Sequence, residues 1–180
     1  MMAISEAMPC DTLVFYDSVS TSGLFHAAVK FNQPGAYYGA IGGAIGWGMG
    51  GTLGVKLAHA DRPVIGIVGD GSAMMTIQAL WTAANYNIPA VYVICNNASY
   101  RILKLNMARY KQYVLGQEPT ADNYIGMDFP QPFDMAAIAN ALGVSGHRIE
   151  NPEELGLSLN RAIDSGKPAL LDVIIDGAIK

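Results

Sequence analysis

Hydrophobic positions follow two alternating patterns along the chain. Four predominantly apolar runs predict buried strands, at residues 13–16, 64–68, 90–95 and 169–175. Between two of these runs, Ile77, Leu80, Trp81 and Ala84 recur at the spacing of an amphipathic helix. Apolar strands that alternate with helices are typical of a parallel sheet covered on both faces. We therefore expect an α/β fold with a parallel sheet of about six strands.

Further helices are indicated by composition and by terminal signals. The stretch "STSGLFHAAVKF" and residues 135–142 have helical patterns. At Asn151 the sequence "NPEE" supplies an N-cap, a proline in the first turn and two acids near the positive helix end, and this helix closes near Gly166. Residues 112–132 are the least regular stretch, and we predict a loop there over a site or interface.

The segment at 36–55 has no charged residue and is long enough to span a bilayer. It is rich in glycine, however, and the rest of the chain has the pattern of a water-soluble α/β domain, so no membrane span is expected. Gly42, Gly46, Gly50 and Gly54 recur every four residues and predict a smooth helical stripe. That stripe has two interpretations, plain helix packing and a subunit contact.

Length and charge restrict the function classes. The 180 residues suit one domain, residues 1–180, and the net charge of −4 gives no general case for nucleic acid binding. Only 14% of residues are charged, so we expect a partner to cover part of the surface. Cys10 and Cys95 are interpreted as reduced thiols, and the N-terminal residues lack the pattern of a signal peptide. A cytoplasmic location is therefore expected.

The triplet "GDG" ends one predicted strand and "NN" ends the next. The carboxyl ends of neighbouring parallel strands lie at one edge of a sheet, so Asp70 and Asn97 should lie close together. A carboxylate, an amide oxygen and a nearby main-chain carbonyl suit Mg²⁺, which shares its shell with phosphate oxygens. The glycines allow close approach of a phosphate, and Ser72 is predicted to begin a helix whose N–H groups favour an anion.

The residues of this motif allow two other interpretations. Asp70 could simply cap the following helix. The loop could also be a degenerate dinucleotide motif, although Met74 replaces its third glycine and asparagines stand where an acid is expected after the next strand.

The stretches "PGAYYGAIGGAIG", "GDGSAMMTIQALWTAANYNIP" and "NNASY" resemble the thiamine-diphosphate-dependent enzyme family. The resemblance extends over the whole chain and is greatest to the diphosphate-binding domain of benzoylformate decarboxylase and acetolactate-synthase-like enzymes. It implies the thiamine-diphosphate-binding fold, with thiamine diphosphate and Mg²⁺ as cofactors and a 2-keto acid as substrate. "ASYRILKLNMARY", after Asn97, lies closer to the acetolactate-synthase-like branch.

The resemblance assigns roles to individual residues. Asp70, the side chain of Asn97 and the main-chain carbonyl of Ser99 would ligate Mg²⁺. Ile45 would be the wedge that bends the cofactor, and a valine, Val19, replaces the family's usual hydroxyl residue beside the diphosphate. The full set implied to bind the cofactor is Ser20, Gly43, Ile45, Gly69, Gly71, Ser72, Asn97, Ser99 and Tyr100.

No catalytic residue is assigned within this chain. The resemblance implies that the proton-relay glutamate belongs to a separate pyrimidine-binding domain, and none of the five glutamates here has the expected context. The pyrimidine-binding and central domains are absent, so the chain is expected to be a piece of a longer enzyme or one subunit of a split enzyme, inactive alone and part of a homo- or hetero-oligomer.

The favoured function is part of a lyase or carboligase that acts on 2-keto acids. The alternatives are a 2-hydroxyacyl-CoA lyase, a non-catalytic module that binds a cofactor or partner, and a nucleotide-binding oxidoreductase domain. Trp47 and Trp81 are predicted to lie in the core. The three histidines are predicted to be surface or hydrogen-bonded residues.

A basic helix is predicted after the "NN" motif. Arg101, Lys104, Arg109 and Lys111 follow it closely. A solvated helix face is the favoured interpretation, and contact with an acidic substrate or acyl-CoA is the alternative.

Overall fold

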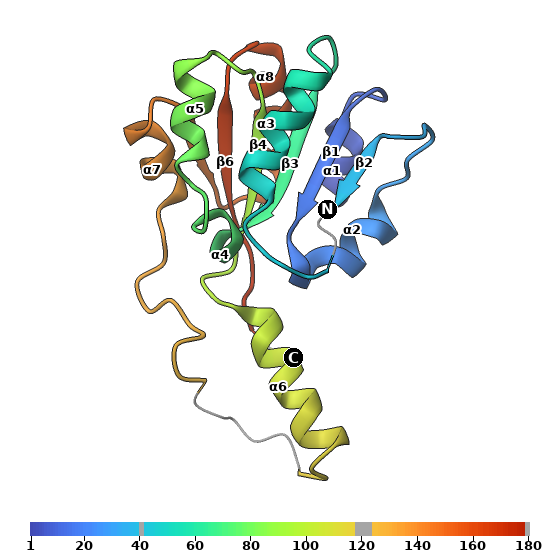
Figure 1. Ribbon diagram of the computed structural model, residues 1–180, viewed down its shortest axis with the longest axis vertical. Helices are drawn as coiled ribbons and strands as arrows, with labels where there is room; N and C mark the ends of the chain where they lie inside the picture. The colour runs from blue at the N-terminus through green and yellow to red at the C-terminus, as the bar shows by residue number, and fades with distance from the viewer. Residues whose placement is uncertain (40–41, 118–123, 179–180) are drawn as a thin grey trace.

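The computed structural model describes residues 1–39, 42–117 and 124–178. Its centre is a six-stranded sheet in the order β2-β1-β3-β4-β6-β5, and every neighbouring pair is parallel (Figure 1). The strands are β1 (Leu13–Asp17), β2 (Tyr37–Gly39), β3 (Val64–Gly69), β4 (Val91–Asn96), β5 (Ser145–Ile149) and β6 (Ala169–Ile174). The predicted α/β fold with a parallel sheet of about six strands is confirmed.

Helices cover both faces of the sheet. They are α1 (Met2–Ala7), α2 (Ser22–Ala28), α3 (Gly48–Ala58), α4 (Asp70–Ala73), α5 (Ala79–Asn85), α6 (Arg101–Tyr113), α7 (Met135–Ala141) and α8 (Pro152–Asp164), with a 3-10 turn, η1, at Val19–Thr21. Helices α1, α2 and α8 pack on one face through residues such as Phe25 and Leu159. Helices α3, α5 and α7 pack on the other through Met49, Leu80 and Met135.

Helix α6 differs from the others because it projects beyond the carboxyl end of the sheet (Figure 1). Its outward face carries exposed apolar side chains, among them Leu103, Met107 and Tyr110. Such a face is typical of a surface that another domain or subunit covers.

The strands missed by the sequence pattern are the two edge strands. The central strand β4 is buried at every position, which explains its uninterrupted apolar run. In β2 no residue is fully buried, and in β5 only Ile149 is. Because edge strands of this kind face solvent, their sequences contain no apolar run that would mark them.

The predicted helical glycine stripe is wrong in its first half. Gly42 and Gly46 have φ angles of 83° and 100°, which no α-helix allows, and α3 begins only at Gly48. Gly50 and Gly54 lie within α3 as predicted. Residues 40 and 41 of this segment lie outside the described residues. None of the helices within the described ranges has both the length and the apolar composition that a bilayer crossing requires.

The prediction that Trp47 and Trp81 are core residues is also wrong, because they are 61% and 55% exposed. Helix α5 starts at Ala79, later than predicted, and buries Leu80 instead. Trp81 follows Leu80 by one residue, a rotation of about 100° around the helix, so it faces away from the sheet.

Three further predictions are confirmed. The side chain of Asn151 accepts a hydrogen bond from the main-chain N–H of Glu153 and caps α8. Cys10 and Cys95 are free thiols. The three histidines, each within hydrogen-bond distance of a hydroxyl group, are His26, His59 and His147.

Candidate functional site

The loops that follow β1, β3 and β4 meet in one pocket at the carboxyl end of the sheet. The strand that follows β1 in the sequence, β2, lies on one side of it, and the next strand, β3, lies on the other, so the direction of strand addition reverses between β1 and β3. Open α/β sheets bind ligands at such switch points. The pocket is lined by Asp17, Ser18, Val19, Ser20, Ile45, Gly69, Asp70, Gly71, Ser72, Asn97, Ser99, Tyr100, Arg101 and Ile102. Asp70 and Asn97 therefore share a cavity, as the spacing of the two motifs predicted.

Asp70 carries a buried carboxylate with an unused oxygen. The residue is 2% exposed, and its Oδ2 has no hydrogen-bond partner among the described residues. Burial raises the pKa of Asp70 to about 6, although the main-chain N–H groups of Gly71 and Ala98 oppose the shift. Gly69, rather than Asp70, is the N-cap of α4. The capping interpretation is therefore wrong, and the free oxygen suits a cation.

Asn97 lies in a tight turn that faces Asp70 across the pocket. Its Oδ1 accepts a hydrogen bond from Ser99 N at 3.0 Å, and its Nδ2 donates to Ser20 Oγ at 3.4 Å. The intervening Ala98 has a φ of 51°, an uncommon conformation for a residue with a side chain. The amide oxygen can still accept on its second lone pair, so it remains usable as a cation ligand.

Asp17 is a site residue that the sequence predictions missed. Its Oδ2 accepts hydrogen bonds from Gly46 N at 3.0 Å, from Gly48 N at 2.8 Å and from the hydroxyl of Ser72. The Ser72 hydroxyl also accepts from Gly46 N at 2.8 Å. The available signal was an acid directly after the apolar run at 13–16. Asp17 thus joins the end of β1, the glycine-rich turn and α4.

Ser72 does not begin a helix as predicted, because the single turn of α4 starts at Asp70 and ends at Ala73. The Ser72 hydroxyl is already hydrogen-bonded to Asp17 and Gly46, so the group of Ser72 that can bind an anion is its main-chain N–H. Next to it, the ring of Tyr100 lies over Gly71, so closely that a Cβ on this glycine would be 2.5 Å from the ring. The glycine is therefore required by the approach of Tyr100.

The glycine-rich turn presents Ile45 to the pocket, where its side chain is 36% exposed. The turn is fixed on either side of Gly46, whose N–H donates to Asp17 and whose carbonyl accepts from Thr76 Oγ1 at 2.7 Å. Gly43 does not line the pocket and is exposed in a left-handed conformation. The structure thus brings together all the predicted site residues except Gly43.

The basic residues after the second motif do not form one solvated face. Lys104 is 7% exposed and its ammonium pairs with the carboxylate of Asp128, so the predicted solvated face is wrong for this residue. Arg101 donates from Nε to the carbonyl of Ala178 at 3.1 Å. Arg109 is exposed, as predicted.

No glutamate in the described part of the chain lines the pocket. Glu118 lies outside the described residues. Within the described ranges there is also no group of three histidine, cysteine, aspartate or glutamate side chains that could hold a metal. A cation here would therefore depend on amide and main-chain oxygens beside Asp70.

Comparisons with known proteins agree with this geometry. The family described as thiamine pyrophosphate enzyme, C-terminal TPP binding domain, matches residues 17–173. Benzoylformate decarboxylase of Pseudomonas aeruginosa is 37% identical over 170 residues, 94% of this chain and 30% of that protein. The mitochondrial acetolactate synthase catalytic subunit of Aspergillus candidus is 34% identical over 134 residues, 74% of this chain and 18% of that protein.

A solved structure extends the likeness to three dimensions. The thiamine diphosphate-dependent 4-hydroxybenzoylformate decarboxylase of Rhodococcus jostii superposes with a TM-score of 0.85 at 32% identity, covering 97% of this chain and 31% of that one. The chain therefore spans about a third or less of the length of these relatives.

Proposed function

This chain belongs to the thiamine pyrophosphate enzyme family, in which it matches the C-terminal TPP-binding domain, and on that premise we propose that it binds the diphosphate of thiamine diphosphate through Mg²⁺. The proposed reaction class is lyase or carboligase chemistry on 2-keto acids, in the cytoplasm. The names of the relatives, benzoylformate decarboxylase and acetolactate synthase, support this class.

The observation that carries the proposal is the free Oδ2 of Asp70. Burying a carboxylate oxygen without a hydrogen-bond partner costs free energy, and a bound cation offsets that cost. Asn97 lines the same pocket and retains a lone pair on its amide oxygen. We assign the Mg²⁺ ligands to Asp70 Oδ2, Asn97 Oδ1 and the main-chain carbonyl of Ser99.

The remaining site residues have positioning roles in this proposal. Gly71 and the main-chain N–H of Ser72 would receive the diphosphate, because the first turn of α4 leaves N–H groups without helical partners. Ser20 would assist from η1, and Tyr100, directly before α6, would close the pocket. Gly69 would contribute through its backbone, which lines the pocket at the end of β3.

Bound thiamine diphosphate supplies a thiazolium carbon nucleophile and an electron sink for the carbanion left by C–C cleavage. The role of this chain in that chemistry would be to hold the cofactor in a bent conformation and to exclude water from it. Ile45 is suited to this because it is apolar and reaches the pocket from a turn that Asp17 holds. Gly43, beside that turn, would contact the pyrimidine end.

The proposal includes a partner domain or subunit. None of the described glutamates lines the pocket, so the proton-relay glutamate would come from a pyrimidine-binding domain. The chain also exposes Trp47, Leu57, Leu103 and Met107, apolar side chains that such a domain would cover. We therefore propose an oligomeric enzyme in which this chain alone has no significant turnover.

Calorimetric titration with thiamine diphosphate tests the proposal. Binding is expected in Mg²⁺ and is expected to disappear in a chelator or in Asp70→Asn, whereas NAD should not bind. Asp164→Asn, an exposed acid on α8, is the matched control and should bind like the wild type. Equal binding with and without Mg²⁺, or by Asp70→Asn, would contradict the proposal. Turnover by the purified chain without a partner domain would contradict the partner requirement.

A further inference from the structure

The turn that carries Asn97, Ala98 and Ser99 belongs to no helix or strand, yet it must keep two of the proposed ligands, Asn97 Oδ1 and the Ser99 carbonyl, aimed at one point. Ala98 has a positive φ, which costs about 1 kcal/mol or more for a residue with a Cβ. The conformation therefore depends on contacts from outside the turn. These contacts come from residues 127–129 on one side and from the C-terminal residues on the other.

Residues 127–129 hold the turn by main-chain hydrogen bonds. Tyr100 N donates to the Met127 carbonyl at 2.8 Å, and Ser99 Oγ donates to the same oxygen at 3.0 Å. Phe129 N donates to the Ala98 carbonyl at 2.9 Å. This short antiparallel contact places Asp128 opposite Ser99. Any shift of residues 127–129 would therefore move the turn.

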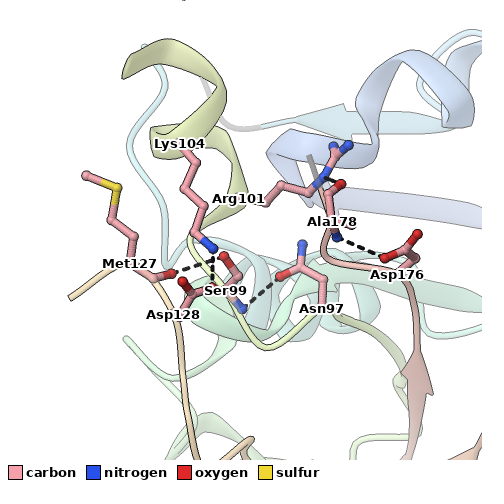
Figure 2. A network of polar contacts seen from close by, with 8 residues as sticks. All are labelled: Asn97, Ser99, Arg101, Lys104, Met127, Asp128, Asp176 and Ala178. Atoms are coloured by element: carbon pink, nitrogen blue, oxygen red, sulfur yellow. Dashed lines mark hydrogen bonds and ion pairs between the residues drawn. The ribbon is translucent and has the colours of Figure 1, made fainter. Parts of the chain in front are cut away.

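Lys104 fixes residues 127–129 in turn. It is on α6, one helical turn after Tyr100, and its side chain is 9% exposed. The ammonium pairs with the Asp128 carboxylate (Figure 2). It also lies 5.9 Å from the centre of the Tyr124 ring. Lys104 does not line the pocket shared by Asp70 and Asn97. It therefore acts on the site indirectly, through Asp128 and the turn.

The C-terminal residues hold the opposite side of the turn. Arg101 Nε donates to the carbonyl of Ala178 (Figure 2). A Cβ on Gly177 would be 2.4 Å from the Asn97 carbonyl oxygen, so the two backbones are in close contact there. Displacement of residues 127–129 would remove the three hydrogen bonds that they make to the turn and leave it held by the C-terminal residues and Ser20.

We propose that Lys104 is a positioning residue of the cation site: its ion pair with Asp128 holds the Asn97–Ser99 turn in the conformation that ligates the divalent cation. The inference rests on the proposed function, and it adds a residue that touches neither cation nor cofactor. Outer residues that orient metal ligands typically change metal affinity by about 10- to 100-fold when removed.

The experiment compares the full chain with Lys104→Met, Asp128→Asn and the double variant. Mn²⁺ affinity in the presence of thiamine diphosphate, measured by electron paramagnetic resonance, should fall about tenfold in each single variant. The double variant should lose no more than the singles, because all three break one interaction. Lys167→Met, an exposed lysine just before the amino end of β6 and so at the end of the sheet opposite α6, is the matched control and should bind like the wild type.

Hydrogen exchange in the cofactor-free chain gives a second, independent measurement. The amides of Tyr100 and Phe129 should exchange at least about tenfold faster in Lys104→Met, whereas the core amides of β4 should be unchanged. Wild-type affinity together with wild-type exchange in Lys104→Met would overturn the inference alone. A wild-type chain that takes up no Mn²⁺ would overturn the proposed function, and with it the cation role of Lys104. Faster exchange throughout β4 would reduce Lys104 to a general stabilising residue and would also overturn the inference.

Discussion

The Asp17 carboxylate accepts a hydrogen bond from the Ser72 hydroxyl across a sequence separation of 55 residues. The same oxygen accepts from Gly46 N and Gly48 N. One carboxylate oxygen therefore joins three segments that are distant in the sequence: the end of β1, the glycine-rich turn and α4. Asp17 is only 3% exposed, so removing its carboxylate leaves these donors without their acceptor in a largely buried position. The shape of the pocket rim thus depends on this carboxylate.

Asp17→Ala should lower the free energy of unfolding by about 3 kcal/mol, because it leaves buried donors without an acceptor. Asp17→Asn retains one oxygen in the same place, so it should cost about 1 kcal/mol. Urea denaturation of the two variants measures the difference. Equal losses in both would show that the acceptor oxygen is not the stabilising feature.

Gly71→Ala should destabilise the chain by about 1–3 kcal/mol, because its Cβ would be 2.5 Å from the Tyr100 ring. Gly50→Ala is the matched control: it lies within α3 with nothing within 4 Å of its added Cβ. That change should stabilise by about 0.5–1 kcal/mol through helix propensity. Thermal unfolding checks both signs. Two changes of the same sign would contradict the proposed contact of Tyr100 with Gly71.

Ile45→Ala should leave the stability of the chain nearly unchanged, within about 1 kcal/mol, because the side chain is already 36% exposed. In a complete enzyme it should lower kcat by about a hundredfold, because the cofactor would no longer be held in its reactive geometry. The control Ile67→Ala, fully buried in β3, should cost about 2–5 kcal/mol. Urea denaturation and steady-state kinetics measure the two effects. An unchanged kcat in Ile45→Ala would show that Ile45 does not act as the wedge that bends the cofactor.

The sequence pattern predicted the parts of the fold that burial determines. Strands β3 and β4 are apolar at nearly every position because both faces of the sheet are covered, so their residues alone identify them. The edge strands β2 and β5 were missed because most of their residues are partly or fully exposed, so burial does not restrict them to apolar types. Trp81 was wrongly placed in the core because hydrophobicity alone does not say which side of a helix faces the sheet, and Trp47 because it lies in the turn before α3 and not within an element packed on the sheet.

The candidate site was predictable where its residues follow strand ends directly. Asp70 and Asn97 come at the ends of adjacent parallel strands, so topology alone brings them together. Asp17 has the same position at the end of β1. A single acid outside a recognised motif, however, does not reveal that three hydrogen-bond donors will surround it. Lys104 resembled an ordinary surface lysine because its partner, Asp128, lies in a stretch without periodicity.

The last prediction concerns the pH dependence of stability without a cation. Burial raises the pKa of Asp70 from 3.8 to about 6, so the folded chain holds this proton more tightly than the unfolded chain. The resulting stabilisation is fully present below about pH 4 and is lost as the pH rises through 6. A shift of about two pKa units corresponds to about 3 kcal/mol.

Asp70→Asn removes this titration, so the free energies of unfolding of wild type and variant should diverge between pH 4 and pH 7. Urea denaturation in a chelator should show the wild type losing up to about 3 kcal/mol relative to the variant over that range. Adding Mg²⁺ with thiamine diphosphate at pH 7 should stabilise the wild type and leave the variant unchanged, because only a carboxylate attracts the cation strongly. Parallel pH curves for the two proteins would mean that Asp70 is not held in an unfavourable charged state, and the argument that its free oxygen requires a cation would fail.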